Sequence, residues 1–143
     1  MTNHLSIIWL HAIWSTEDRK RDLSKDFRFR LFRHMKEYST TKGIHLDIIN
    51  GVEDHVHCLI RLKTTERVSE ILQLIKGESS RWINKNVILD HEFRWQKGYG
   101  VFSLNQNDVL KVRKYIYNQE KHHKNMSYDI ELKNLVPKTG KQD

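Results

Sequence analysis

The sequence predicts an α+β fold, a four-stranded antiparallel sheet with helices on one face and an additional helix towards the C-terminal end. Segments rich in strand-forming residues alternate with segments whose apolar residues recur every three or four positions. The order of these segments is β-α-β-β-α-β-α. Only one proline and six glycines occur, and no linker, low-complexity tract or internal repeat is visible.

The first half of the chain supplies a central strand and a helix. Residues 5–14 are apolar on both faces, which is typical of a strand in the middle of a sheet. A charged loop at 15–21 precedes a helix at 24–42, with Ser24 as a candidate N-cap and Gly43 after its end. The helix prediction comes from the spacing of Phe27, Leu31, Met35 and Tyr38.

The remaining segments follow from the same periodicities. Strands are expected at 44–48, 54–60 and 95–104, and helices at 66–84, 108–122 and 127–135. The first two of these strands form a hairpin through the turn at 50–54. Four strands with two intervening helices in this order describe a ferredoxin-like (RRM-like) sandwich, to which the 108–122 helix is an addition.

Length and composition indicate one domain in the cytosol. We expect a single domain at 1–136 and a flexible tail at 137–143. The one cysteine, Cys58, excludes an intramolecular disulfide. The start of the chain lacks the pattern of a signal peptide, and the longest apolar run is too short to span a membrane. We therefore expect a cytosolic protein without a membrane partner.

The charge favours a polyanionic partner, most simply nucleic acid. The net charge is +7 with neutral histidines, and the isoelectric point is about 9.5. Ordinary solvation of a basic surface remains the alternative. The candidate phosphate contacts are Arg19, Lys20, Arg21, Lys76, Arg81 and Lys97.

Two histidines on the 54–60 strand form a candidate metal site. His55 and His57 share one face of the strand, roughly 6–7 Å apart, whereas Val56 and Cys58 point to the other face. A surface pair or a hydrogen-bonded pair is the alternative. Asp54 either orients a histidine ring or closes the turn, and we favour the turn.

The 108–122 helix carries residues that complement the histidines. Tyr115 and Gln119 lie one turn apart on one face, and Tyr117 projects elsewhere. A tyrosine hydroxyl can attack a phosphodiester and form a covalent intermediate. Mixed nitrogen and oxygen ligands from His55, His57 and Gln119 suit Mg²⁺ or Mn²⁺. Packing of Tyr115 and solvation of Gln119 remain the alternatives.

These residues together resemble a known family, the single-tyrosine HUH transposases of the insertion sequence 200/605 group. The resemblance rests on three motifs in this order: His55-Val56-His57, Lys76-Gly77-Glu78-Ser79-Ser80, and Tyr115-Ile116-Tyr117-Asn118-Gln119. Gly51 and the segment 95–100 match as well. Members serve small insertion sequences of prokaryotes that move as single-stranded DNA.

The resemblance implies a ferredoxin-like fold, an obligate homodimer and binding of DNA hairpins at the ends of the element. It implies cleavage of single-stranded DNA by Tyr115 through a 5′-phosphotyrosine, with His55, His57 and Gln119 as ligands of Mg²⁺ or Mn²⁺. Tyr115 of one subunit can then serve the histidines of the other. His122 and His123 depart from the simplest motif, and for His122 we favour a phosphate contact or solvation. The alternative function is a non-catalytic or domesticated hairpin-binding protein of the same fold.

Overall fold

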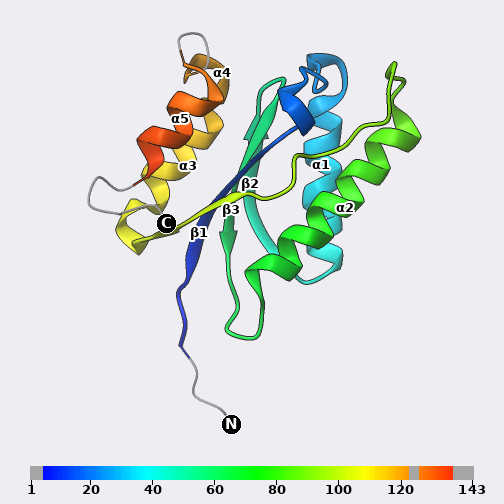
Figure 1. The fold of residues 1–143 in the computed structure, drawn as a ribbon. Coiled ribbons are helices and arrows are strands. Elements are labelled where there is room, and N and C mark those ends of the chain that lie inside the picture. Colours follow the sequence, from blue (N-terminus) through cyan, green and yellow to red (C-terminus); the bar gives the residue numbers. More distant parts are fainter. Residues whose placement is uncertain (1–4, 123–125, 137–143) are drawn as a thin grey trace.

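The computed structural model describes residues 5–122 and 126–136, and its centre is an antiparallel sheet with the strand order β2-β3-β1-β4. The strands are β1 (Trp9–Ser15), β2 (His45–Gly51), β3 (His55–Arg61) and β4 (Gly100–Leu104). β1 pairs with both β3 and β4, which confirms its central position. This order is the ferredoxin-like topology that the sequence predicts (Figure 1).

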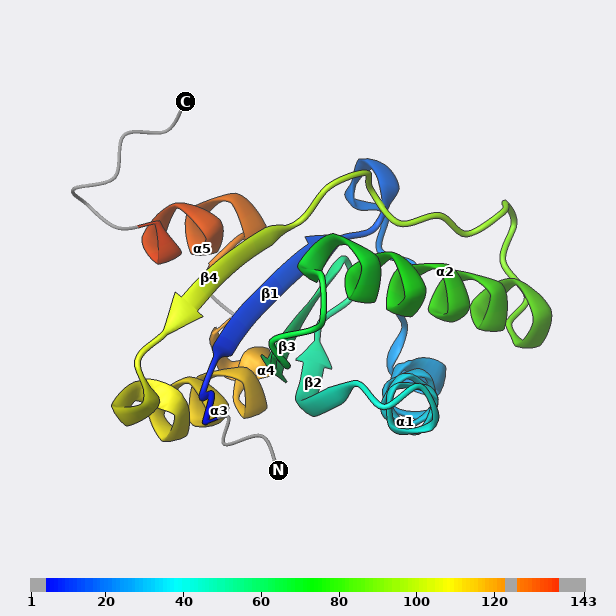
Figure 2. The same ribbon diagram turned by 90° about the horizontal axis from the view of Figure 1, so that it is seen from below.

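Helices cover both faces of the sheet (Figures 1 and 2). α1 (Lys25–Thr41) and α2 (Val68–Asn86) pack on one face. The other face carries α3 (Val109–Tyr117), α4 (Gln119–His122) and α5 (Tyr128–Leu135). Short 3₁₀ turns at Glu17–Arg19 and Gln106–Asp108 follow β1 and β4. None of the helices in this part of the chain is long and apolar enough to cross a membrane.

Side-chain alternation along β3 divides the interior into two layers. Val56, Cys58 and Ile60 belong to the larger core under α1 and α2. Leu59 packs instead with Val109 and Ile116 of α3. His55 and His57 share the face of Leu59 because side chains two positions apart point the same way. The histidine pair is therefore directed at the second helical layer, as the sequence pattern predicts.

Several element boundaries differ from the prediction, among them the end of β2, which continues to Gly51 into the predicted turn, and α2, which is shifted to 68–86. β1 begins at Trp9 because its pairing with β3 and β4 begins there, and Leu5 and Ile7 are 89% and 50% exposed. β4 begins only at Gly100, since Gly98 turns the chain with a φ of +88°. The 108–122 helix is divided at Asn118, whose φ of −96° and ψ of 26° end α3. The expected tail at 137–143 lies outside the described residues.

Gly51 closes the hairpin that leads into the histidine strand. It pairs with Val56, and a Cβ atom at Gly51 would lie 2.3 Å from the carbonyl oxygen of His55. Gly77 differs, because a Cβ atom there would meet nothing within 4 Å and α2 continues through it. The backbone of β2 thus approaches that of His55 so closely that only glycine fits at Gly51.

We expect Gly51→Ala to lower the free energy of unfolding by about 1–3 kcal/mol, because the new methyl group must push the hairpin apart. Gly77→Ala is the matched control and should raise it by up to about 1 kcal/mol, since alanine is the better helix former. Urea unfolding of both variants measures the difference. Equal stability of Gly51→Ala and the natural protein would contradict the close approach.

Candidate active site

His55 and His57 form the floor of a buried polar centre. Both side chains are fully buried, and their ring centroids are 5.3 Å apart. In each ring the Nδ1 atom contacts a neighbouring side chain on the side away from the centre. Asp54 Oδ1 lies 2.7 Å from His55 Nδ1, and His11 Nε2 of β1 lies 2.7 Å from His57 Nδ1. This leaves the two Nε2 atoms directed at the same point.

Asp54 and His11 both contact the histidine pair. The preference for Asp54 as a turn residue alone is wrong, because its carboxylate holds His55 while its backbone carbonyl accepts a hydrogen bond from Thr16. His11 had no signal in the local pattern. Burial, reinforced by the nearby His57, lowers the pKa of His11 to about 3, so this imidazole is neutral.

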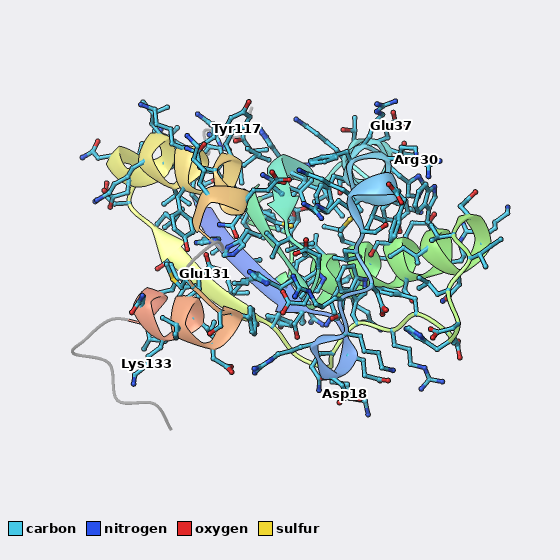
Figure 3. All side chains as sticks on the ribbon, turned by 90° about the horizontal axis from the view of Figure 1, so that it is seen from above. Asp18, Arg30, Glu37, Tyr117, Glu131 and Lys133 are labelled. Carbon is cyan, nitrogen blue, oxygen red and sulfur yellow. The ribbon has the colours of Figure 1, made fainter. Side chains whose placement is uncertain are left out.

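Tyr115 and Gln119 reach the same centre from the second helical layer. The Tyr115 ring lies 5.8 Å from the His57 ring. Gln119 is fully buried and donates from Nε2 to Glu131 Oε2 at 3.4 Å. Their one-turn spacing therefore places both beside the histidines, although the helix is divided between them. Tyr117 is 73% exposed and lies at the outer edge of α3 (Figure 3).

Glu131 of α5 occupies the middle of this centre, facing the sheet (Figure 3). Its Oε1 atom lies 2.9 Å from His55 Nε2 and 2.7 Å from His57 Nε2. Its Oε2 atom accepts a hydrogen bond from the Tyr115 hydroxyl. Sequence reasoning missed Glu131. No local pattern marked it, because the inward face of this helix is defined only by the sheet that it meets.

The electrostatics of the centre hold Tyr115 as a neutral phenol. Burial, together with the hydrogen bond to Glu131, raises the pKa of Tyr115 above its usual value. For His55, burial alone would lower the pKa, but the hydrogen bonds to Asp54 and Glu131 outweigh burial and raise it. An anionic carboxylate thus favours the protonated forms of the groups around it.

The donor set of the centre fits a divalent ion. The two Nε2 atoms and the Glu131 carboxylate lie within 4.8 Å of one another. The Gln119 Oε1 atom is buried and has no hydrogen-bond partner within residues 5–122 and 126–136. A buried amide oxygen needs a donor or a cation, because leaving it unsatisfied costs about 1–3 kcal/mol. Imidazole nitrogen and carboxylate or amide oxygen are both ligands of divalent metal ions.

The predicted basic residues fall into different environments. Arg19 forms an ion pair with Asp129 and lies over the Tyr128 ring, which packs on His55 with centroids 4.8 Å apart. Arg21 lies 3.6 Å from a Glu53 carboxylate oxygen, and Lys20 is exposed. Arg19 is thus brought to the edge of the centre.

Lys76 and Lys97 line a groove of about 500 Å³ between α2 and the segment 94–99, together with Trp95 and Tyr99. Lys76 Nζ donates to the carbonyl oxygens of Gln96 and Gly98 at 2.9 and 2.8 Å. Arg81 instead binds Glu78 on α2 itself. The His122 side chain and the whole of His123 lie outside the described part of the chain.

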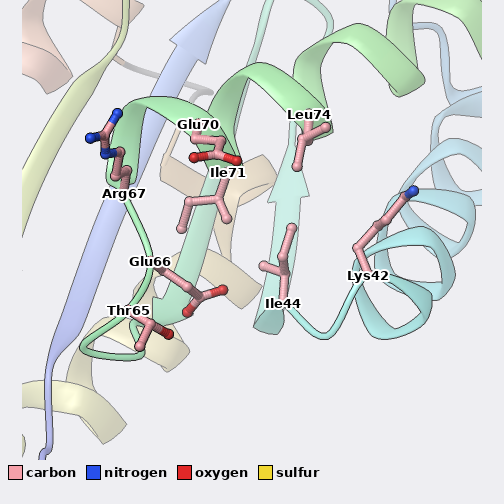
Figure 4. Close-up of a pocket in the computed structure, with 8 residues that line it drawn as sticks. All are labelled: Lys42, Ile44, Thr65, Glu66, Arg67, Glu70, Ile71 and Leu74. Carbon is pink, nitrogen blue, oxygen red and sulfur yellow. The ribbon is translucent and has the colours of Figure 1, made fainter.

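A separate hollow of about 190 Å³ lies between the end of α1 and the start of α2 (Figure 4). Lys42, Ile44, Arg67 and Glu70 are among its lining residues. No candidate catalytic residue contributes to it, so we assign it no part in the chemistry.

The chain is similar in sequence and in structure to known transposases. The ISDra2 transposase TnpA of Deinococcus radiodurans is 20% identical over 117 residues, which cover 76% of this chain and 81% of that protein. A crystal structure of a transposase candidate from Deinococcus radiodurans R1 matches with a TM-score of 0.67 and 21% identity, over 83% of this chain and 95% of that one.

A REP-associated tyrosine transposase, solved bound to a REP hairpin, matches with a TM-score of 0.59 and 18% identity, over 86% of this chain and 75% of that one. These structural matches confirm the fold. A family model described as IS200-like transposase matches residues 4–119. Because the matched residues make up most of this chain of 143 residues, the chain belongs to the IS200-like transposase family.

Proposed function

We propose that this member of the transposase family cuts and rejoins single-stranded DNA through a covalent bond to Tyr115. One observation carries the proposal: Tyr115, His55, His57 and Gln119 meet in one centre, where the Tyr115 ring lies beside His57 and all four side chains contact Glu131. Nucleophilic attack on phosphorus needs this kind of placement.

In the proposed step, the Tyr115 oxygen attacks the phosphorus of a phosphodiester. The bond from phosphorus to the 3′ oxygen breaks, which leaves a 5′-phosphotyrosine and a free 3′-hydroxyl. The phenol loses its proton to the surroundings, and the departing 3′ oxygen takes one up. A 3′-hydroxyl of another cut strand then attacks the phosphotyrosine in the reverse sense and completes strand transfer without hydrolysis.

A divalent ion, Mg²⁺ or Mn²⁺, completes the proposal. His55 Nε2, His57 Nε2 and Gln119 Oε1 would hold it, and when bound it would polarise the scissile phosphate. Asp54 and His11 contact the two Nδ1 atoms and so keep both Nε2 atoms turned towards the centre, where an imidazole would bind the ion. The protein's own contribution is this orientation and the exclusion of water from the buried centre.

The proposed partners are DNA hairpins and a second copy of the chain. The relative solved with a REP hairpin supports hairpin binding, as does the net charge of +7. The homodimer follows from the family resemblance. Within one chain Tyr115 already lies beside that chain's own histidines, so the proposal allows cleavage in cis as well as exchange of Tyr115 between subunits.

The competing function is a hairpin-binding protein that does not cut DNA. Formation of a covalent protein–DNA adduct distinguishes the two functions. We expect the natural protein to form an adduct with single-stranded hairpin DNA from its own element in the presence of Mg²⁺ or Mn²⁺. Tight binding without any adduct would favour the binding protein.

Tyr115→Phe should reduce adduct formation by at least about a thousandfold, because it removes only the attacking oxygen. DNA binding should stay unchanged. Tyr117→Phe, two residues away on the exposed side, is the control and should keep full activity. Denaturing gel electrophoresis of labelled DNA measures both. An adduct that survives in Tyr115→Phe and disappears in Tyr117→Phe would move the nucleophile to Tyr117.

Lys97→Ala should weaken binding of single-stranded DNA and make it less dependent on salt. The loss of one phosphate contact lowers the slope of log affinity against log salt by about 0.7. Arg30→Ala, which removes an exposed charge on α1 that does not line the groove, should leave the slope unchanged. Fluorescence anisotropy at several salt concentrations measures it. Equal slopes for both variants would remove the groove from the DNA interface.

A further inference from the structure

We propose that Glu131 is a ligand of the divalent ion and supplies the negative charge that the two histidines and Gln119 lack. The family model ends at residue 119, so Glu131 lies beyond the part of the chain that the family pattern describes. The inference rests on the proposed function for the presence of an ion, but it is tested without DNA.

The donor atoms are already spaced as ligands of one ion. Two ligands that each lie about 2.1 Å from an octahedral ion, at right angles to each other, are about 3 Å apart. Glu131 Oε1 lies 2.9 Å from His55 Nε2 and 2.7 Å from His57 Nε2. Because the two Nδ1 atoms face Asp54 and His11, both Nε2 atoms are aimed at this carboxylate oxygen.

The burial of the Glu131 carboxylate also favours a cation beside it. Glu131, His55 and His57 are all fully buried. A carboxylate loses much solvation on burial and needs compensating positive charge close by. The His11 ring stands behind His57, on the Nδ1 side and away from Glu131. A divalent ion held by Oε1 and the two Nε2 atoms would supply the positive charge, while Oε2 accepts the hydrogen bond from the Tyr115 hydroxyl.

The attachment of α5 explains how Glu131 reaches the centre. Tyr128, one turn before Glu131, packs on the His55 ring. Asp129, two residues before Glu131, forms an ion pair with Arg19. One residue after it, Leu132 packs so close to β4 that a Cβ atom at Gly100 would lie 3.3 Å from Leu132 Cδ1. Contacts on both sides therefore fix the helix and aim Glu131 at the histidines.

The test is the affinity of the full-length, metal-free protein for Mn²⁺, measured by isothermal titration calorimetry. Glu131→Gln keeps the size and hydrogen-bonding capacity of the side chain and removes its charge. We expect it to weaken Mn²⁺ binding about 10- to 100-fold. Glu37→Gln, the same change on the exposed side of α1 (Figure 3), should bind as the natural protein does.

A second measurement guards against a folding defect. The visible absorption of bound Co²⁺ reports its ligands directly, and we expect Glu131→Gln to change the spectrum while its circular dichroism stays native. Mn²⁺ affinity and a Co²⁺ spectrum identical to those of the natural protein would overturn the inference. Tighter binding by Glu131→Gln would also overturn it, since Glu131 would then merely cover the histidines until an ion displaces it.

The inference and the proposed function fail in different ways. A Tyr115 adduct together with unchanged Mn²⁺ affinity in Glu131→Gln would refute the ligand and leave the function standing. Mn²⁺ binding that depends on Glu131, without any DNA adduct, would support the ligand and refute the function. Absence of Mn²⁺ binding by the natural protein at millimolar concentrations would overturn the inference itself.

Discussion

The alternation of side chains along β3 is the constraint on which the rest of the structure depends. One face of this strand gives Val56, Cys58 and Ile60 to the core under α1 and α2. The other face gives His55 and His57 to the buried centre. A slip of one residue in the pairing would exchange the two sets and bury imidazoles in an apolar core. The close approach at Gly51 holds the register at the end of the strand where the histidines lie.

The sequence predicted those parts of the site that depend on local spacing. A period of two placed His55 and His57 on one face, and a helical step placed Tyr115 beside Gln119. Glu131 and His11 contact the histidines across 74 and 46 positions of the chain, and no local period reports such pairs. The inward glutamate of α5 is recognisable only once the sheet face that it meets is known.

The fold was predictable to the level of topology, and the errors lie at the ends of elements. Leu5 and Ile7 have the composition of a strand, but neither β3 nor β4 extends far enough to pair with them. The backbone of Trp95 forms an isolated bridge to Thr16, just after β1, but no continuous strand, because Gly98 interrupts the chain before β4 begins. Strand propensity is necessary for an edge strand, but the partner decides its length.

The negative charge of Glu131 links the histidines of β3 to Tyr115 of α3. Without an ion, the Glu131 carboxylate accepts a hydrogen bond from the Tyr115 hydroxyl, and together with burial it raises the pKa of the phenol. This arrangement opposes formation of the phenolate that would attack phosphorus. Positive charge beside Glu131 acts in the opposite direction, because it stabilises anions around it. The histidine strand and the tyrosine helix are therefore coupled through one carboxylate, and the acidity of the Tyr115 phenol follows the charge beside Glu131.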